Sequence, residues 1–142
     1  MIIIVDGFDK SGRTTLAKKI GEEIGGSHII DPIPYRRPDS LWEFISDMDF
    51  ILKTGANVVF DGSIMSDDSF VLSNDEIGVL GSFFNNNNVF LYFCHSDNYE
   101  KLKEASGLTD DMFVDHSTKT YTKFTGLHMF CPVITHDIFK TN

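Results

Sequence analysis

Cysteines and long hydrophobic runs are scarce in this chain of 142 residues. The two cysteines, Cys94 and Cys131, lie in apolar stretches, which favours reduced thiols in a core over a disulfide or a catalytic thiol. No segment approaches the roughly 20 apolar residues that a membrane span needs. Residues 1–10 have neither the basic region nor the small-residue cleavage site of a secretory signal. We therefore expect an untargeted, cytoplasmic protein.

Positive charge is also in short supply. Twelve Lys and Arg face twenty-one Asp and Glu, and the net charge is −9. This balance disfavours a general nucleic-acid surface, because such a surface needs clustered cations to displace counterions. The charge is unevenly distributed: residues 1–37 hold six basic and five acidic residues, a net of +1, so residues 38–142 carry −10. All three arginines lie in the first segment, which directs attention to the anions that they meet there.

The hydrophobic share of 42% and thirteen phenylalanines are typical of a folded globular chain, and the length suits one domain over residues 1–142. Apolar patterning predicts strands at residues 2–5, 28–30, 58–60, 89–94 and 133–135. It predicts helices at residues 13–24, 41–53, 61–72, 74–84, 97–105 and 109–124, with a loop over the asparagines at 85–88. This alternation predicts a three-layer α/β/α domain with a five-stranded parallel sheet, in which ligands bind beyond the carboxyl ends of the strands.

A glycine-rich loop follows the first apolar strand and precedes an amphipathic helix. Residues 7–14 match the P-loop pattern G-x-x-x-x-G-K-[ST], except that Arg13 stands at the lysine position. Backbone N–H groups of such a loop curl around phosphate oxygens, and the Thr14 hydroxyl would ligate Mg²⁺. The alternative is a glycine turn with a helix cap at Ser11 or Thr14. The expected phosphate-binding residues are Gly7, Lys10, Ser11, Gly12, Arg13, Thr14 and Thr15.

The arginine affects what this loop can do. Lysine delivers a compact charge between the outer phosphates of a nucleotide, whereas arginine is a bulkier planar fork. We expect Arg13 to bridge the charges of phosphate donor and acceptor, although the sequence supports phosphate binding more firmly than phosphoryl transfer.

With these residues, the chain resembles the thymidylate kinase-like nucleoside monophosphate kinases of the P-loop superfamily, in a compact form of the sort that phages encode. The family's opening pattern, acidic-Gly-x-Asp-x-x-Gly-Lys-[ST]-Thr, is similar to Asp6–Thr15. The resemblance implies that Asp9 approaches the acceptor sugar. The family's F-P-x-R segment is similar to Ile33–Arg36, which implies that Arg36, with Arg37 beside it, holds the acceptor phosphate.

A third motif of that family, D-R-[YH]-x-x-S-x-x-[AS]-[YF], is similar to residues 61–70. The resemblance implies that Asp61 orients Mg²⁺ through water, and the alternative is a turn or helix-capping role. It also places Ser66 and Phe70 on the acceptor side. Two phenylalanines of the preceding helix, Phe44 and Phe50, are candidates for stacking on the acceptor base, with core packing as the alternative.

Besides Arg13, the chain departs from the family at two further places. Gly62 stands where the family has an arginine, and the segment after Cys94 has none of the family's lid arginines, so we expect a reduced lid. Four lysines are either substitutes for these cations or ordinary solvated side chains: Lys101, Lys103, Lys119 and Lys123.

Two functions remain open. The first is an enzyme that uses ATP and Mg²⁺ to phosphorylate a deoxynucleoside monophosphate, thymidylate-like or carrying a hydroxymethylated pyrimidine, with Arg13, Arg36 and Asp61 as its catalytic residues. The second is a nucleotide-binding protein with weakened transfer and a regulatory or assembly role. The resemblance also implies that the chain pairs as a homodimer. Its acidic surface disfavours DNA as the acceptor.

Overall fold

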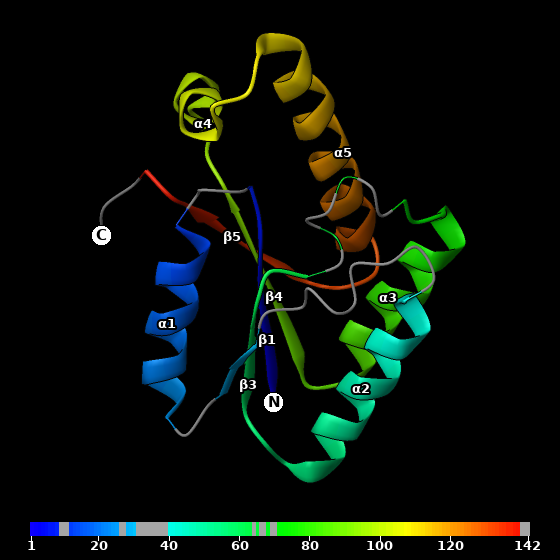
Figure 1. Cartoon of the computed structure of the whole chain (residues 1–142). Coiled ribbons are helices and arrows are strands. Elements are labelled where there is room, and N and C mark those ends of the chain that lie inside the picture. The colour runs from blue at the N-terminus through cyan, green and yellow to red at the C-terminus, as the bar shows by residue number, and fades with distance from the viewer. Residues whose placement is uncertain are drawn as a thin grey trace.

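A computed structural model describes residues 1–8, 12–25, 28–30, 40–63, 65, 68 and 71–139, and these form one parallel sheet with helices on both faces (Figure 1). The strands are β1 (Ile2–Gly7), β2 (His28–Ile30), β3 (Val58–Asp61), β4 (Val89–His95) and β5 (Val133–Asp137), in the order β2-β3-β1-β4-β5. The helices are α1 (Arg13–Ile24), α2 (Leu41–Thr54), α3 (Asn74–Asn86), α4 (Tyr99–Ser106) and α5 (Asp110–His128). The predicted three-layer α/β/α class with a five-stranded parallel sheet is confirmed.

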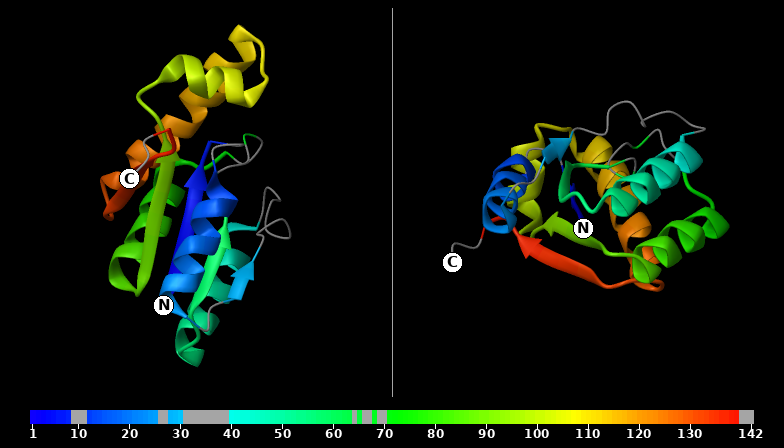
Figure 2. Two further views of the ribbon diagram at one scale, coloured as in Figure 1. Left: turned by 90° about the vertical axis from the view of Figure 1, so that its left-hand side faces the viewer. Right: turned by 90° about the horizontal axis from the view of Figure 1, so that it is seen from below.

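The core lies on both sides of β1, all of whose residues are buried. Ile2 and Ile4 pack toward α2, α3 and α5, whereas Ile3 and Val5 pack toward α1. Figure 2 shows the resulting layers, with α1 alone on its face of the sheet. This two-sided burial explains why the first strand is an unbroken run of β-branched residues and does not alternate with polar ones.

The carboxyl ends of the strands meet at one edge, and α4 and the start of α5 project beyond it (Figure 1). β1 lies between β3 and β4, with Val5 opposite Asp61 and Gly7 opposite Cys94. The ends of three central strands therefore converge on the start of α1, which is where open α/β sheets bind ligands.

The sequence predicted that Asp61 opens a turn into a helical stretch through Leu72; for the described residues the helix is wrong, because none of them in that stretch is α-helical. Gly62 takes a positive φ of 97° and its N–H donates to Val5 O at 2.7 Å. The Met65 N–H donates to the Ser63 hydroxyl at 3.1 Å. The positive φ of Gly62 is incompatible with an α-helix at this position, and its bond to β1 holds the backbone in that conformation.

The loop predicted over the asparagines at 85–88 is wrong for its first half, because α3 continues to Asn86. The Asn87 side chain donates to Phe83 O at 2.9 Å and so satisfies a carbonyl at the helix end. The last helix and strand are also longer than predicted, since α5 reaches His128 and β5 reaches Asp137. No described helix is long and apolar enough to cross a membrane.

Both cysteines are free and buried, as predicted. Burial raises the pKa of the Cys94 thiol from its ordinary value of 9.0 to about 12, against an opposing effect of the nearby Arg13. Burial likewise raises the pKa of Cys131, to about 11. The folded state thus favours the neutral thiols, and both groups are unreactive at neutral pH.

This shift predicts an alkaline loss of stability. Because the folded pKa of Cys94 exceeds the unfolded one, its contribution is complete below pH 9 and is lost as the pH rises toward 12. Between pH 9 and 11, the unfolding free energy of the wild-type protein should fall more steeply than that of Cys94→Ala, by up to about 1.4 kcal/mol per pH unit. Urea denaturation at several pH values measures both slopes, and parallel slopes would contradict the prediction.

Candidate active site

The candidate site begins at Gly7, the last residue of β1. Its φ is +124°, and a Cβ at this position would lie 2.2 Å from the carbonyl oxygen of Cys94 on β4. The next N–H along the chain, that of Phe8, donates to the same Cys94 oxygen at 3.1 Å. Only glycine lets the backbone turn out of the sheet this close to a neighbouring strand. The sequence prediction that Gly7 begins a backbone-lined loop therefore has a steric basis.

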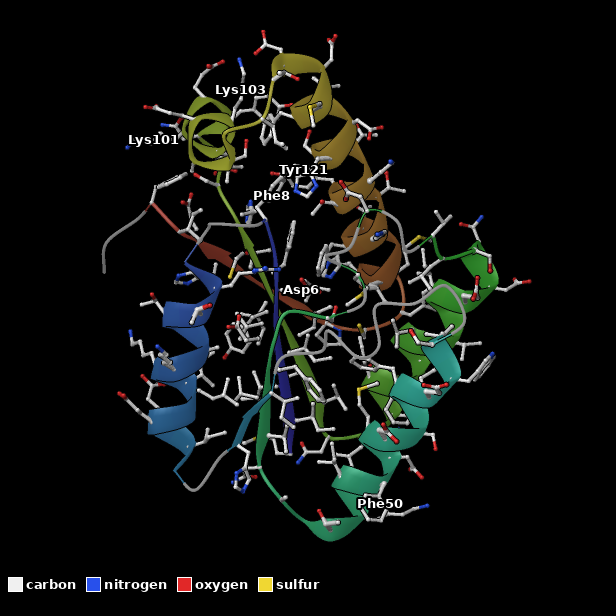
Figure 3. All side chains as sticks on the ribbon, viewed as in Figure 1. Asp6, Phe8, Phe50, Lys101, Lys103 and Tyr121 are labelled. Carbon is white, nitrogen blue, oxygen red and sulfur yellow. The ribbon has the colours of Figure 1, made fainter. Side chains whose placement is uncertain are left out.

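Asp6, one residue earlier, is fully buried at the centre of the molecule (Figure 3). Its carboxylate accepts hydrogen bonds from three described residues. Its Oδ1 accepts from the Gly7 N–H at 2.8 Å and from Arg13 Nη1 at 3.3 Å. Its Oδ2 accepts from the Ser63 hydroxyl. Asp6 is the acidic residue that opens the motif Asp6–Thr15, but no role was predicted for it. The available signal was a carboxylate at the end of an otherwise apolar strand, where a charge needs a partner.

Arg13 lies in the first turn of α1 and its side chain is only 13% exposed. Besides Asp6, its Nη1 lies 3.5 Å from the Gly7 carbonyl oxygen, so the guanidinium folds back against the end of β1. The expectation was a cation that bridges phosphate donor and acceptor. The structure places Arg13 in an ion pair with a carboxylate of its own chain, and the bridging role stays a prediction.

Thr14 and Asp61, the two residues predicted to serve Mg²⁺, contact each other directly. The Thr14 hydroxyl donates to Asp61 Oδ2 at 2.7 Å, although the two residues are 47 positions apart. α1 contributes the hydroxyl and β3 the carboxylate, both at the carboxyl edge of the sheet. Hydroxyl and carboxylate oxygens are hard ligands of the kind that Mg²⁺ prefers, and it usually takes few of them, with water and phosphate oxygens completing the shell. This pair fits such an ion; the described residues hold no group of three or more His, Cys, Asp or Glu suited to a metal.

Gly62 follows Asp61 and departs from the family motif for a structural reason. Its φ of 97° lies in the region that L-residues rarely adopt, and its N–H donates to Val5 O on β1. An arginine here would carry backbone strain of about 1–3 kcal/mol. The glycine therefore holds the end of β3 against β1.

The segment after Gly62 is joined to α5 through a buried lysine. Lys123 is 7% exposed, and its Nζ donates to Met65 O at 3.1 Å. Hydrogen bonds thus run without a break from Arg13 through Asp6, Ser63 and Met65 to Lys123. Of the four lysines considered as cation substitutes, this one is buried in the fold.

The other three lysines make surface contacts. Lys119 pairs with Asp115 one turn away at 2.9 Å, Lys103 pairs with Asp110, and Lys101 lies 5.6 Å from the ring centroid of Phe139. Figure 3 shows Lys101 and Lys103 on α4, beyond the carboxyl edge of the sheet.

An aromatic cluster surrounds Phe8, the residue that follows β1, and was not predicted from the sequence. Phe8 is 2% exposed and contacts Tyr121 and His116 edge-on, with ring centroids 5.3 and 5.5 Å apart. His116 Nδ1 lies 2.8 Å from Asp68 Oδ2 in the segment that follows β3. Packing of this kind fixes the start of the glycine loop to α5. A lone phenylalanine in a loop gives no sequence signal of its partners.

The expected substrate residue Phe50 lies elsewhere. Its side chain is 69% exposed on α2, at the end of the molecule away from the carboxyl edge of the sheet and far from the labelled Asp6 and Phe8 (Figure 3). It neither joins the site nor packs in the core, because it faces away from the helix side that carries Phe44, which is 1% exposed in the core. Stacking of either phenylalanine on a base is therefore not supported.

The remaining expected residues divide into two groups. Gly12 caps α1 with a φ of 76°, and Thr15 is exposed in its first turn, so both lie where a phosphate-binding loop needs them. The others lie outside the described residues: Asp9, Lys10, Ser11, Arg36, Arg37, Ser66 and Phe70.

No protein-family model matches the chain, and no curated protein matches it in sequence. Three solved structures of similar fold are those of deoxyadenosine kinase from M. mycoides, with the products dCMP and a flexible dCDP bound, with dCTP bound and with dATP bound. They are 12%, 13% and 12% identical to this chain, with TM-scores of 0.56, 0.56 and 0.57. The alignments cover 99% of this chain and 92%, 92% and 93% of theirs. The chain therefore shares its fold with these structures over its whole length.

Proposed function

We propose that this protein transfers a phosphoryl group from ATP, with Mg²⁺, to a deoxynucleoside monophosphate with a thymidylate-like base. The observation that carries this proposal is the 2.7 Å contact between Thr14 and Asp61. It lies at the start of α1, the helix that follows the first strand and the glycine-rich loop. A hydroxyl and a carboxylate from distant parts of the chain meet beside a helix N-terminus. That combination suits a nucleotide triphosphate and its metal better than a simple helix cap.

In this proposal, each residue acts by position and charge. Backbone N–H groups of the loop between Gly7 and Thr14 bind phosphate oxygens, and the start of α1 adds its positive dipole end. The Thr14 hydroxyl and the Asp61 carboxylate hold the metal site in place. Bound Mg²⁺ would neutralise charge on the outer phosphates. Arg13 adds a further positive charge beside the same loop.

The acceptor side rests on residues outside the described part of the chain. Asp9 would approach the acceptor sugar, Arg36 and Arg37 its phosphate, and Ser66 and Phe70 its base side. The structures of similar fold are those of a deoxyadenosine kinase with dCMP and dCDP, dCTP or dATP bound. These ligands support a deoxynucleotide or deoxynucleoside as the acceptor. A hydroxymethylated pyrimidine nucleotide remains a variant of the same proposal.

A second candidate is a nucleotide-binding protein with weakened transfer. The Asp6–Arg13 ion pair favours it, because a cation that is partly neutralised by its own chain supplies less charge to a moving phosphoryl group. In that case the protein would respond to nucleotide as a regulator or assembly partner.

A coupled phosphoryl-transfer assay distinguishes the two. Wild-type protein and Arg13→Lys are supplied with ATP, Mg²⁺ and a panel of deoxynucleosides and deoxynucleoside monophosphates, and thermal stabilisation by nucleotide is recorded in parallel. The enzyme proposal predicts product from at least one wild-type reaction. Thermal stabilisation without product, with turnover restored by Arg13→Lys, would support the second candidate. Absence of any nucleotide effect on melting would contradict both.

A further inference from the structure

The Asp6 carboxylate is a negative charge at the place where a nucleotide would bring several more. It is fully buried, whereas the Arg13 side chain that it contacts is still 13% exposed. A phosphate that reaches Arg13 must therefore share the guanidinium with Asp6. Because buried charges are weakly screened, the carboxylate opposes phosphate binding more strongly than a surface charge would.

The hydrogen bonds around Asp6 hold it in one orientation. One carboxylate oxygen accepts from the Gly7 N–H and from Arg13, and the other accepts from Ser63. Ser63 in turn accepts from the Met65 N–H. Arg13 Nη1 thus meets two fixed acceptors, the Asp6 carboxylate and the Gly7 carbonyl oxygen, and together they restrict the orientation of the guanidinium.

The same contact explains why arginine can stand at a lysine position. A guanidinium has five N–H donors on three nitrogens, whereas an ammonium has its three donors on one nitrogen. Arg13 directs Nη1 to Asp6 and the Gly7 carbonyl, and the guanidinium carries its remaining donors on two further nitrogens. A lysine nitrogen would have to serve Asp6 and a phosphate from a single point.

We infer that Asp6 is a positioning residue, which holds Arg13 in a fixed orientation for phosphoryl transfer and in doing so weakens nucleotide binding. This inference rests on the proposed function, since it assigns Asp6 a role at the same phosphate site. The carboxylate lowers affinity because it repels phosphate, and it raises turnover because the guanidinium is already oriented when the phosphate arrives.

The test is Asp6→Asn, a change that keeps the shape of the side chain and an oxygen for the Gly7 N–H. The expected result is ATP binding about three- to tenfold tighter by titration calorimetry, with a smaller gain for AMP, because fewer phosphate charges feel the lost carboxylate. Turnover should fall about tenfold or more, since Arg13 loses its orientation. The matched control is Asp49→Asn, which removes a carboxylate that pairs with Lys53 on the exposed surface of α2. It should change neither quantity.

ATP affinity that is unchanged in Asp6→Asn, or weakened together with turnover, would overturn the inference, because a merely structural role predicts those results. Failure of wild-type protein to bind ATP would instead contradict the proposed function.

A second measurement uses wild-type protein and does not depend on how the variant folds. In ¹⁵N spectra without nucleotide, the Nη signals of Arg13, assigned by their loss in Arg13→Lys, should be split by slow guanidinium rotation and should shift on addition of ATP. Signals averaged as in free arginine would overturn the inference.

Discussion

Asp61→Asn is expected to lower the rate of phosphoryl transfer about a hundredfold or more, which is a typical loss when one preorganised charge is removed from a transfer site. The amide still accepts the Thr14 hydroxyl bond, so the protein should fold, but it no longer offers the negative charge that favours Mg²⁺. Steady-state kinetics over a range of Mg²⁺ concentrations should show a lower maximal rate and a higher requirement for the metal.

The control for this change is again Asp49→Asn, which alters the same side chain and net charge on the outer surface of α2. Its kinetics should match those of the wild-type protein. Equal activity of Asp61→Asn and the wild-type protein would mean that the contact between Thr14 and Asp61 caps the helix and serves no metal, and the proposed function would lose its main support.

Gly7→Ala is expected to destabilise the fold by about 3 kcal/mol or more. The added methyl group would lie 2.2 Å from the Cys94 carbonyl oxygen, and the φ of +124° is strained for alanine. Relief of this clash requires β1 and β4 to move apart where both are buried. Urea denaturation measures the loss, and titration with ATP measures the accompanying loss of binding.

Gly12→Ala provides the comparison. Gly12 also has a positive φ, of 76°, but no atom of the described residues lies within 4 Å of a Cβ built there, so the cost should be only about 1 kcal/mol. Similar losses at the two glycines would show that backbone strain alone matters and that the close approach of β4 to Gly7 does not.

Much of the fold could be predicted because the sequence pattern and the final burial agree. The apolar run of β1 is buried on both faces, and the spacing of Ala17 and Ile20 places one side of α1 on the sheet. That Thr14 and Asp61 lie near each other could also be predicted, because parallel strands bring their carboxyl ends to one edge of the sheet.

Other features depend on contacts that no local pattern encodes. The direction of the Arg13 side chain is set by Asp6, whose burial follows from the assembled sheet. The helix predicted after Asp61 fails because Gly62 bonds across to β1, which is a tertiary effect on a local preference. Phe50 lies on the side of α2 opposite to Leu41 and Met48, and the helical spacing of these buried residues was the signal against a site role for it.

The backbone at Gly62 also limits how this protein can be re-engineered. An arginine at this position, as in the kinase family that the chain resembles, would add a side chain at a φ of 97° and cost about 1–3 kcal/mol in backbone strain. Relief of that strain needs a different φ, which would move the N–H that donates to Val5. The arginine substitution and a change in the backbone around position 62 would each be unfavourable alone. Their effects on stability are therefore not additive, which is epistasis set by backbone geometry.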